Sequence, residues 1–362
     1  MTFPNVFEGK RVFITGHTGF KGSWLAAWMH QLGADVTGFA LPPDYPDSHF
    51  EKLGLAKRIN HIEGDLRDAD RLRQALCEAK PDFVFHLAAQ PLVRRSYAEP
   101  KLTFDTNIGG SVNLLEAVRA CDTVRVLIYV TSDKCYRNQE SRRGYRETDE
   151  LGGHDPYSAS KACAELVFAS YQASFFNASH SVMSASVRAG NVIGGGDWAA
   201  DRIVPDSIRA LLARQAIAVR NPGAVRPWQH VLEPLSGYVA LATELYHGHK
   251  DRGGAWNFGP AHEAHRRVEE LVDAVIEFWG SGSMTLLAPT NGNLKETSFL
   301  YLNCEKAIHE LGWSPMFTFR EAVRETVEWY RRATETDNVW ELTRSQIDAY
   351  MLRGVREEAP AK

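Results

Sequence analysis

The stretch VFITGHTGFKGSWLAAWMHQLG (residues 12–33) places Gly16, Gly19 and Gly22 between a short run of apolar residues and a segment of helical composition. Glycine is needed where the chain turns tightly and where the backbone must approach another group closely. A strand–turn–helix unit of this kind presents N–H groups at the positive end of a helix dipole, and such units bind the phosphates of dinucleotides. The stretch therefore predicts the first strand, phosphate-binding loop and helix of a dinucleotide-binding α/β domain.

The rest of the first half repeats this alternation of strand and helix. Segments 68–79 and 111–121 carry apolar residues at helical spacing. Apolar strands that alternate with such helices indicate βαβ units, a parallel sheet covered on both faces and a ligand crevice at the carboxyl ends of the strands. The predicted strands are 11–16, 35–41, 59–65, 82–89, 125–132 and 181–189.

The composition and periodicity of the sequence change after Arg188. Residues 189–202 (AGNVIGGGDWAADR) are rich in glycine and polar residues, which is typical of a long loop, and helical periodicity returns later. We expect an α/β fold, a Rossmann-type doubly wound parallel sheet with a smaller mixed α/β C-terminal substrate-binding lobe. The predicted parts are a dinucleotide-binding domain at 1–188 with a returning segment near 227–258, a lobe at 189–226 and 259–345, and a disordered tail at 354–362.

Charge and cysteine content exclude several function classes. The chain has 41 Lys+Arg against 45 Asp+Glu and no basic cluster of the kind that marks nucleic-acid binding. Five widely spaced cysteines without a C-x-x-C pair argue against a disulfide framework and against a zinc site, so no metal is expected. The N-terminus does not read as a signal peptide, and no apolar run approaches the ~18 residues of a membrane span, so we expect a cytoplasmic protein that does not bind membranes.

The segment DPYSASKACAEL (155–166) contains Tyr157 and Lys161, four residues apart. On a helix, which Pro156 is well suited to open, this spacing puts both side chains on one face. A phenol titrates near ~10, and a cation beside it favours the phenolate, which would bring its pKa toward the working range. The pair therefore predicts a catalytic tyrosine assisted by a lysine.

A second polar cluster, TSDKCYR (131–137), directly follows the apolar run VLIYV (126–130). Ser132, Asp133 and Lys134 thus bring a hydroxyl, a carboxylate and an ammonium to the end of a predicted strand. Such a cluster is either a polar loop or the working end of a catalytic site. Its place at the ligand-binding edge of the predicted sheet favours the catalytic interpretation.

From about residue 10 to about residue 330 the chain resembles the extended short-chain dehydrogenase/reductases. The resemblance rests on the glycine spacing, on GDL (64–66), HLAAQ (86–90) and DTNIGGSVNLLEA (105–117), and on the serine, tyrosine and lysine named above. It implies NAD as cofactor, although the second strand ends in GFALPPD, with no well-placed acid or arginine to separate NAD from NADP. The implied cofactor-binding residues are Gly16, Gly19, Phe20, Gly22, Asp65, Leu66, Ala88, Ala89, Gln90, Asn107, Tyr157 and Lys161.

Within this superfamily, several stretches resemble one branch, the CDP-glucose 4,6-dehydratases. The thymidine-linked dehydratases carry Thr-Asp-Glu where this sequence has Ser132, Asp133 and Lys134, and Lys21 replaces an apolar residue before the third glycine. The matching stretches are TGHTGFKGSWL (15–25), AAQPLVRRSY (88–97), TSDKCY (131–136), GNVIGGGDWAADRIVPD (190–206) and RPWQHVLEPLSGY (226–238).

The resemblance implies a closed redox cycle that converts CDP-glucose to CDP-4-keto-6-deoxyglucose and water, for deoxysugar synthesis of the O-antigen type. Tyr157, with Ser132 and Lys161, would take the proton of the sugar 4-OH while the C4 hydride passes to NAD and later returns to C6. Asp133 would protonate the departing C6 hydroxyl. Lys134 would remove the C5 proton, or would stay protonated and stabilise the enolate, and the sequence leaves both roles open.

Substrate contacts are expected from the second half of the chain. Arg202 and Arg226 are candidate diphosphate ligands because guanidinium binds phosphate oxygens bidentately, whereas a surface salt bridge is the alternative for each. Asn191 matches a substrate-binding position of the family, and Arg94 or Arg95 would reach the sugar diphosphate. The resemblance also implies a homo-oligomer, a dimer or tetramer, paired through the segment near 99–121 and the Tyr157 helix.

Three alternatives remain. Another nucleotide-sugar 4,6-dehydratase, such as one acting on GDP-mannose, is expected to keep Glu where Lys134 stands. A 4-epimerase needs no acid at Asp133. A non-catalytic NAD-binding sensor or scaffold would be expected to lose Tyr157 or Lys161, and both are present.

Overall fold

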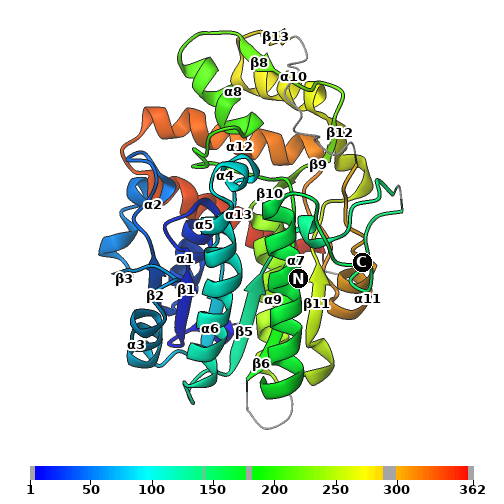
Figure 1. Cartoon of the computed structure of the whole chain (residues 1–362). Coiled ribbons are helices and arrows are strands. Elements are labelled where there is room, and N and C mark those ends of the chain that lie inside the picture. Colours follow the sequence, from blue (N-terminus) through cyan, green and yellow to red (C-terminus); the bar gives the residue numbers. More distant parts are fainter. Residues whose placement is uncertain (1–4, 142, 177–181, 288–298, 358–362) are drawn as a thin grey trace, which may run out of the picture.

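The structure is a computed structural model that describes residues 5–141, 143–176, 182–287 and 299–357. Its centre is a seven-stranded, fully parallel sheet in the order β11-β6-β5-β4-β1-β2-β3 (Figure 1). All six predicted strands are present, so the predicted doubly wound sheet is confirmed. The strands are β1 (Arg11–Thr15), β2 (Asp35–Ala40), β3 (Asn60–Glu63), β4 (Phe83–His86), β5 (Val126–Val130), β6 (Met183–Arg188) and β11 (Gly254–Asn257).

The strand order reverses between β1 and β4, which are neighbours although β2 and β3 lie between them in the chain. In doubly wound sheets the ligand crevice opens at this point, beyond the carboxyl ends of the strands. The glycine loop follows β1, and residues 87–90 follow β4, so these two segments flank the crevice.

Residue alternation along the strands explains the two cores of the sheet. In β5 every residue is buried. Val126, Ile128 and Val130 join one apolar cluster, whereas Leu127 and Tyr129 join another on the opposite face. A strand buried on both faces reads as a continuous apolar run, which is why VLIYV was recognisable in the sequence.

Helices cover both faces of the sheet (Figure 1). Buried residues of α3 (Ala69–Ala79), α6 (Gly110–Arg119) and α7 (Pro156–Tyr171) form the core on one face, and those of α1 (Phe20–Gln31) and α9 (Leu232–Tyr246) belong to the core on the other. The shorter elements are α2 (His49–Lys52), α4 (Val93–Ala98), α5 (Pro100–Phe104), π-helical turns at Asp105–Gly109 and Gln172–Phe176, and 3-10 turns at Asn5–Phe7, Leu55–Lys57, Asp133–Cys135, Lys250–Arg252 and His262–Ala264.

The second half adds a smaller, mixed lobe, whose outer part lies at the top of Figure 1. The described part of this lobe contains three two-stranded pairs, and the loop predicted at 189–202 includes the first strand of one of them. The pairs are β7 (Val192–Ile193) with β10 (Gln229–His230), β8 (Ile217–Val219) with β13 (Met284–Leu286), and β9 (Val225–Pro227) with β12 (His265–Arg267). The helices are α8 (Ile203–Leu212), α10 (Val268–Trp279), α11 (Glu305–Leu311), α12 (Phe319–Glu335) and α13 (Val339–Glu357).

The C-terminal helix corrects one prediction. Helix α13 continues to Glu357, so residues 354–357 of the tail predicted to be disordered are helical. Residues 358–362 lie outside the described residues. Among the helices that the structure describes, none is both long and apolar enough to cross a membrane.

Candidate active site

The glycine loop packs too tightly to accept side chains at two of its three glycines. Gly16 has φ +76°, and a Cβ there would lie 2.7 Å from the Ala88 backbone. A Cβ on Gly22 would come within 2.0 Å of the Gly16 carbonyl oxygen. Gly19 forms the N-cap of α1 and carries no such obstruction nearer than 3.4 Å. The loop therefore brings bare backbone to the N-terminus of a helix, as a phosphate cradle requires.

Asp65 and Leu66, two of the predicted cofactor-binding residues, lie just after β3. The Asp65 carboxylate is bound by the Arg67 backbone N–H at 2.9 Å and by the Arg67 guanidinium, which lowers the pKa of Asp65. Leu66 is buried, and its carbonyl accepts a hydrogen bond from Asn113 at 2.8 Å. Both residues are thus held in place by contacts within the domain.

Asn107 joins the loop after β4 to α7 (Pro156–Tyr171), the helix that carries Tyr157 and Lys161. Its Oδ1 accepts from the Gln90 backbone N–H at 2.8 Å, and its Nδ2 donates to the Gln90 carbonyl at 3.1 Å and to Ser160 Oγ at 2.9 Å. Asn107 and Gln90 are both buried, whereas Ala88 and Ala89 beside them are partly exposed. The two predicted polar residues therefore shape the loop that carries the two alanines.

The predicted catalytic triplet forms a tight turn at the end of β5. Ser132 caps the 3-10 turn Asp133–Cys135, because its Oγ accepts from the Lys134 N–H at 3.2 Å. The same hydroxyl donates to Asp133 Oδ1 at 2.9 Å. Asp133 is buried and Lys134 is partly exposed, and among the described residues Lys134 Nζ has no hydrogen bond or ion pair. The carboxylate is thus fixed, while the ammonium is available to a ligand.

Tyr157 and Lys161 lie on α7, facing this turn. Pro156 occupies the first turn of the helix, as the sequence indicated, and the Asp155 side chain caps the helix. Burial raises the pKa of Tyr157 to about 12, and a hydrogen bond with Ser132 and the charge of Arg202 act in the lowering direction. The predicted shift of the tyrosine pKa toward neutrality is therefore wrong, because burial outweighs the lowering effects of Ser132 and Arg202.

Two further residues near Lys161, His86 and Lys21, were not predicted as site residues. Burial lowers the pKa of Lys161 itself to about 8. Burial also lowers the pKa of His86 to about 3, and His86 Nδ1 lies 2.7 Å from Thr15 Oγ1. Lys21 donates to the Tyr238 hydroxyl at 3.1 Å.

Burial, followed by the charges of Lys161 and Arg202, lowers the pKa of Lys21 to about 7, and Asp133 opposes this shift. Lys21 therefore belongs to the same electrostatic site as Lys161, Arg202 and Asp133. Its departure from the apolar residue usual at that position was the signal in the sequence.

The predicted substrate-binding residues differ in their contacts and in their relation to Tyr157. Arg202 donates to Asp197 at 2.8 Å, which raises the arginine pKa, and its charge reaches Tyr157. Arg94 is half exposed and lies 3.4 Å from Asp201. Asn191 adopts a left-handed conformation, with φ 49°. Arg226, on β9, donates to the Val225 carbonyl at 2.9 Å. Of these residues, Arg202 is the one whose charge acts on the predicted catalytic residue Tyr157.

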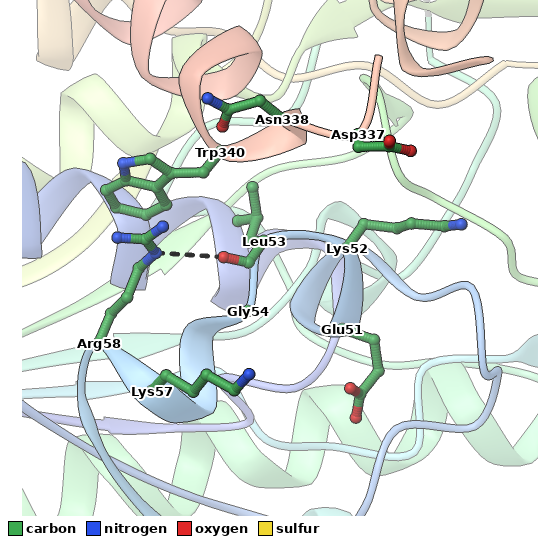
Figure 2. A pocket seen from close by; sticks show the side chains of 9 residues that line it. All are labelled: Glu51, Lys52, Leu53, Gly54, Lys57, Arg58, Asp337, Asn338 and Trp340. Atoms are coloured by element: carbon green, nitrogen blue, oxygen red, sulfur yellow. Dashed lines mark hydrogen bonds between the residues drawn. The ribbon is translucent and has the colours of Figure 1, made fainter. Parts of the chain in front are cut away.

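A surface cavity of about 390 Å³ lies elsewhere, between the α2 region and the start of α13 (Figure 2). Arg58 lies over the Trp340 ring at 4.2 Å there and donates to the Leu53 carbonyl at 3.2 Å. None of its nine lining residues is a predicted site residue. The described residues also contain no cluster of three or more His, Cys, Asp or Glu placed to hold a metal ion.

The sheet order, the glycine loop and the Ser132, Tyr157 and Lys161 constellation define an extended short-chain dehydrogenase/reductase, which confirms the resemblance inferred from the sequence. A profile of the family described as GDP-mannose 4,6 dehydratase matches residues 13–326, and the chain belongs to this family.

Relatives of known name agree with this assignment. The chain is 46% identical over 360 residues to CDP-glucose 4,6-dehydratase of Salmonella typhimurium, covering 98% of this chain and 100% of the relative. It is 27% identical over 330 residues to dTDP-glucose 4,6-dehydratase of Streptomyces antibioticus, covering 88% and 92%.

Solved structures share the fold. A dTDP-glucose 4,6-dehydratase from Streptomyces venezuelae with NAD bound matches with a TM-score of 0.74 at 23% identity, over 89% of this chain and 97% of that one. A UDP-glucose 4-epimerase from Thermus thermophilus in complex with NAD matches with a TM-score of 0.74 at 26% identity, over 89% and 99%.

Proposed function

We propose that this protein is an NAD-dependent CDP-glucose 4,6-dehydratase, which converts CDP-glucose to CDP-4-keto-6-deoxyglucose and water. One observation carries the proposal: a turn with a buried carboxylate and an available ammonium, Asp133 and Lys134, faces Tyr157 and Lys161. The identity of 46% to the Salmonella typhimurium enzyme over nearly the whole chain supports the choice of nucleotide.

The residues present fit NAD. The backbone of Gly16, Gly19 and Gly22 would hold its diphosphate at the N-terminus of α1. The tight packing at Gly16 and Gly22 requires glycine at these two positions and so fixes the loop. NAD would supply redox chemistry by accepting a hydride from sugar C4 and returning it at C6. Besides the three glycines, the residues proposed to contact NAD are Phe20, Asp65, Leu66, Ala88, Ala89, Gln90, Asn107, Tyr157 and Lys161.

In this proposal Tyr157 takes the proton of the sugar 4-OH. Only the phenolate can accept this proton, and burial raises the pKa of Tyr157 to about 12, so the phenolate needs stabilisation before the transfer. The Ser132 hydroxyl and the charge of Arg202 act in that direction. Lys161 adds a cation on the same helix face as the tyrosine.

The turn at the end of β5 would catalyse the elimination of water. Once C4 is a ketone, the C5 hydrogen is acidic. Asp133 would protonate the departing C6 hydroxyl, and its contact with Ser132 Oγ at 2.9 Å holds the carboxylate for this step. Lys134 would remove the C5 proton, or stabilise the resulting enolate as a cation.

The nucleotide sugar would bind between the sheet domain (1–188 with the segment near 227–258) and the lobe (189–226 and 259–345). Arg202 is the best-supported diphosphate ligand, because it is held by Asp197 beside the catalytic groups. Asn191, Arg226 and Arg94 complete the proposed substrate contacts.

Incubation with NAD and CDP-glucose tests the proposal, because a 4-keto sugar develops an ultraviolet band in alkali. We expect the band with CDP-glucose and not with GDP-mannose, UDP-glucose or dTDP-glucose. Turnover of another nucleotide sugar alone would overturn the choice of CDP. Interconversion of C4 epimers without the band would favour a 4-epimerase, and no turnover with retained NAD binding would favour a sensor or scaffold.

We further propose that the protein is a cytoplasmic homo-oligomer, a dimer or tetramer, that pairs through residues 99–121 and α7. Leu166 on α7 supports this surface, since 59% of it is exposed although it is a large apolar residue. The five cysteines are free thiols, as expected in a reducing compartment. Light scattering of Leu166→Glu against the unmodified protein tests the pairing, and an unchanged mass would contradict it.

A further inference from the structure

Beneath the catalytic turn lies a buried ion pair that the roles above do not use. Glu165 on α7 and Arg188 at the end of β6 have side chains that are each 3% exposed. Arg188 Nε and Nη2 donate to the two carboxylate oxygens at 2.9 and 2.7 Å. A buried pair of this kind is stable only when its remaining hydrogen-bonding capacity is met. Thr131 Oγ1 and Ser186 Oγ, the latter at 2.9 Å, donate to the same carboxylate.

Both ends of the catalytic turn, residues 132–135, are attached to this pair. Thr131 directly precedes the turn and donates to Glu165. Tyr136 directly follows the turn, and its hydroxyl accepts from Arg188 Nη1 at 2.6 Å. One ion pair thus holds the turn where the chain enters it and where the chain leaves it.

The same pair reaches the helix that carries the catalytic tyrosine and lysine. Glu165 lies four residues after Lys161 on α7, and this spacing places the two side chains on one helix face. The carboxylate is the main influence that opposes the burial-induced lowering of the Lys161 pKa. The ion pair therefore connects the turn and the helix, which form the two halves of the site.

We propose that Glu165 and Arg188 are positioning residues, whose ion pair fixes the turn 132–135 against the Tyr157–Lys161 face of α7. The kinetic effects expected from this inference rest on the proposed dehydratase function. Proton removal from the sugar 4-OH depends mainly on Tyr157 and Lys161 of α7, with Ser132 of the turn assisting, whereas elimination depends on Asp133 and Lys134 of the turn. Loosening the turn while α7 keeps its place should therefore slow elimination more than oxidation.

Two conservative variants loosen the turn and leave the ion pair intact. Thr131→Val removes the attachment at the entry, and Tyr136→Phe removes the attachment at the exit. Each should lower kcat at least about tenfold with KM within about twofold, because a small displacement of reacting groups costs rate rather than affinity. Slow elimination should also let bound reduced cofactor accumulate, which is read by its absorbance during turnover.

Ser186→Ala is the matched control, since it removes a donor to the same Glu165 carboxylate without touching the turn. It should keep kcat within about twofold of the unmodified protein. Wild-type kcat in both turn variants, or an equal loss in Ser186→Ala, would overturn the inference. So would a fall in kcat without accumulation of reduced cofactor.

A second measurement needs no substrate. The double variant Glu165→Leu with Arg188→Met removes both charges together, which avoids leaving one of them buried and unpaired. The pH dependence of Lys161 carbamylation by cyanate, read by mass spectrometry, should then show a lower lysine pKa than in the unmodified protein. An unchanged pKa would contradict the link between Glu165 and Lys161. Failure of the unmodified protein to turn over any nucleotide sugar would instead contradict the proposed function.

Discussion

The Asp133 carboxylate packs directly against the backbone of Gly190, so that a Cβ added at Gly190 would lie 2.0 Å from Asp133 Oδ2 and 2.2 Å from its Cγ. Gly190 follows β6, and Asp133 follows the neighbouring strand β5. The absence of a side chain at Gly190 therefore gives the proposed general acid its position. This relationship between two adjacent strand ends leads to the first prediction.

Gly190→Ala should displace the Asp133 side chain and lower kcat by roughly 100-fold, because a shift of about 1 Å in a reacting group has effects of that order. NAD binding, measured by fluorescence titration, should stay within about twofold, since the glycine loop lies on another strand. Gly223→Ala is the control, because no atom of the residues that the structure describes lies within 4 Å of a Cβ there. Equal kcat values for the two variants would disprove the role assigned to Gly190.

Lys134→Ala tests the assignment of the C5 base. If Lys134 removes the C5 proton, exchange of that hydrogen with deuterated solvent should fall by about 100-fold or more, as loss of a general base does. Mass spectrometry of the recovered nucleotide sugar measures the exchange. Arg137→Ala is a control on the same segment, where the arginine is exposed and paired with Glu150 at 2.8 Å. Exchange at nearly the unmodified rate would make Lys134 an electrostatic stabiliser.

Tyr157→Phe removes the proposed proton acceptor and leaves the ring in place. We expect kcat to fall by about 10²- to 10⁴-fold, the usual range for a lost acid–base group, with thermal stability nearly unchanged. Tyr97→Phe is the matched control, because Tyr97 is 48% exposed. Activity of Tyr157→Phe close to that of the control would rule out the tyrosine as the catalytic base.

His230 should make the fold sensitive to acid. Its side chain is fully buried and Nε2 has no hydrogen-bond partner among the described residues, and burial lowers its pKa from 6.5 to about 3. The unfolded chain takes up a proton below its own pKa of about 6.5, whereas the folded protein does not. The stabilising contribution is therefore complete above that pH and is lost as the pH falls toward about 3.

His230→Phe should remove this sensitivity. Between about pH 7.5 and about pH 5, the unmodified protein should lose about 2 kcal/mol more unfolding free energy than the variant does. Urea unfolding at the two pH values measures the difference. An equal loss in both proteins would show that His230 does not couple folding to protonation.

Local sequence pattern was sufficient to predict features that occupy one short segment of the chain. The glycine loop, the Tyr157–Lys161 spacing and the fully apolar β5 each occupy one stretch of chain, and their physical signals are strong. Lys21 was harder to place, because its partner Tyr238 is distant in sequence, on α9. The direction of the Tyr157 pKa shift was wrong for a related reason: the neighbouring cation is visible in the sequence, whereas complete burial depends on the assembled fold.

Pairing between segments that are distant in sequence also explains why the short strands of the lobe were not predicted. The strands β8 and β13 have three residues each and pair with each other across most of the lobe sequence. Segments this short carry no periodicity of their own. Arg94 illustrates the same point, because its partner Asp201 belongs to the loop after β6.

The last strand of the sheet, β11, ends at Asn257, after the chain has already formed α8 and the strands around it. Until that residue has been synthesised, β6 has no neighbour on its outer side, and its unpaired N–H and C=O groups form an open edge of the kind that promotes aggregation. A fragment that stops at residue 188 would expose this edge permanently. The two halves of the sequence are therefore not independent folding units. A nascent chain cannot complete its dinucleotide-binding sheet before much of the C-terminal lobe has left the ribosome.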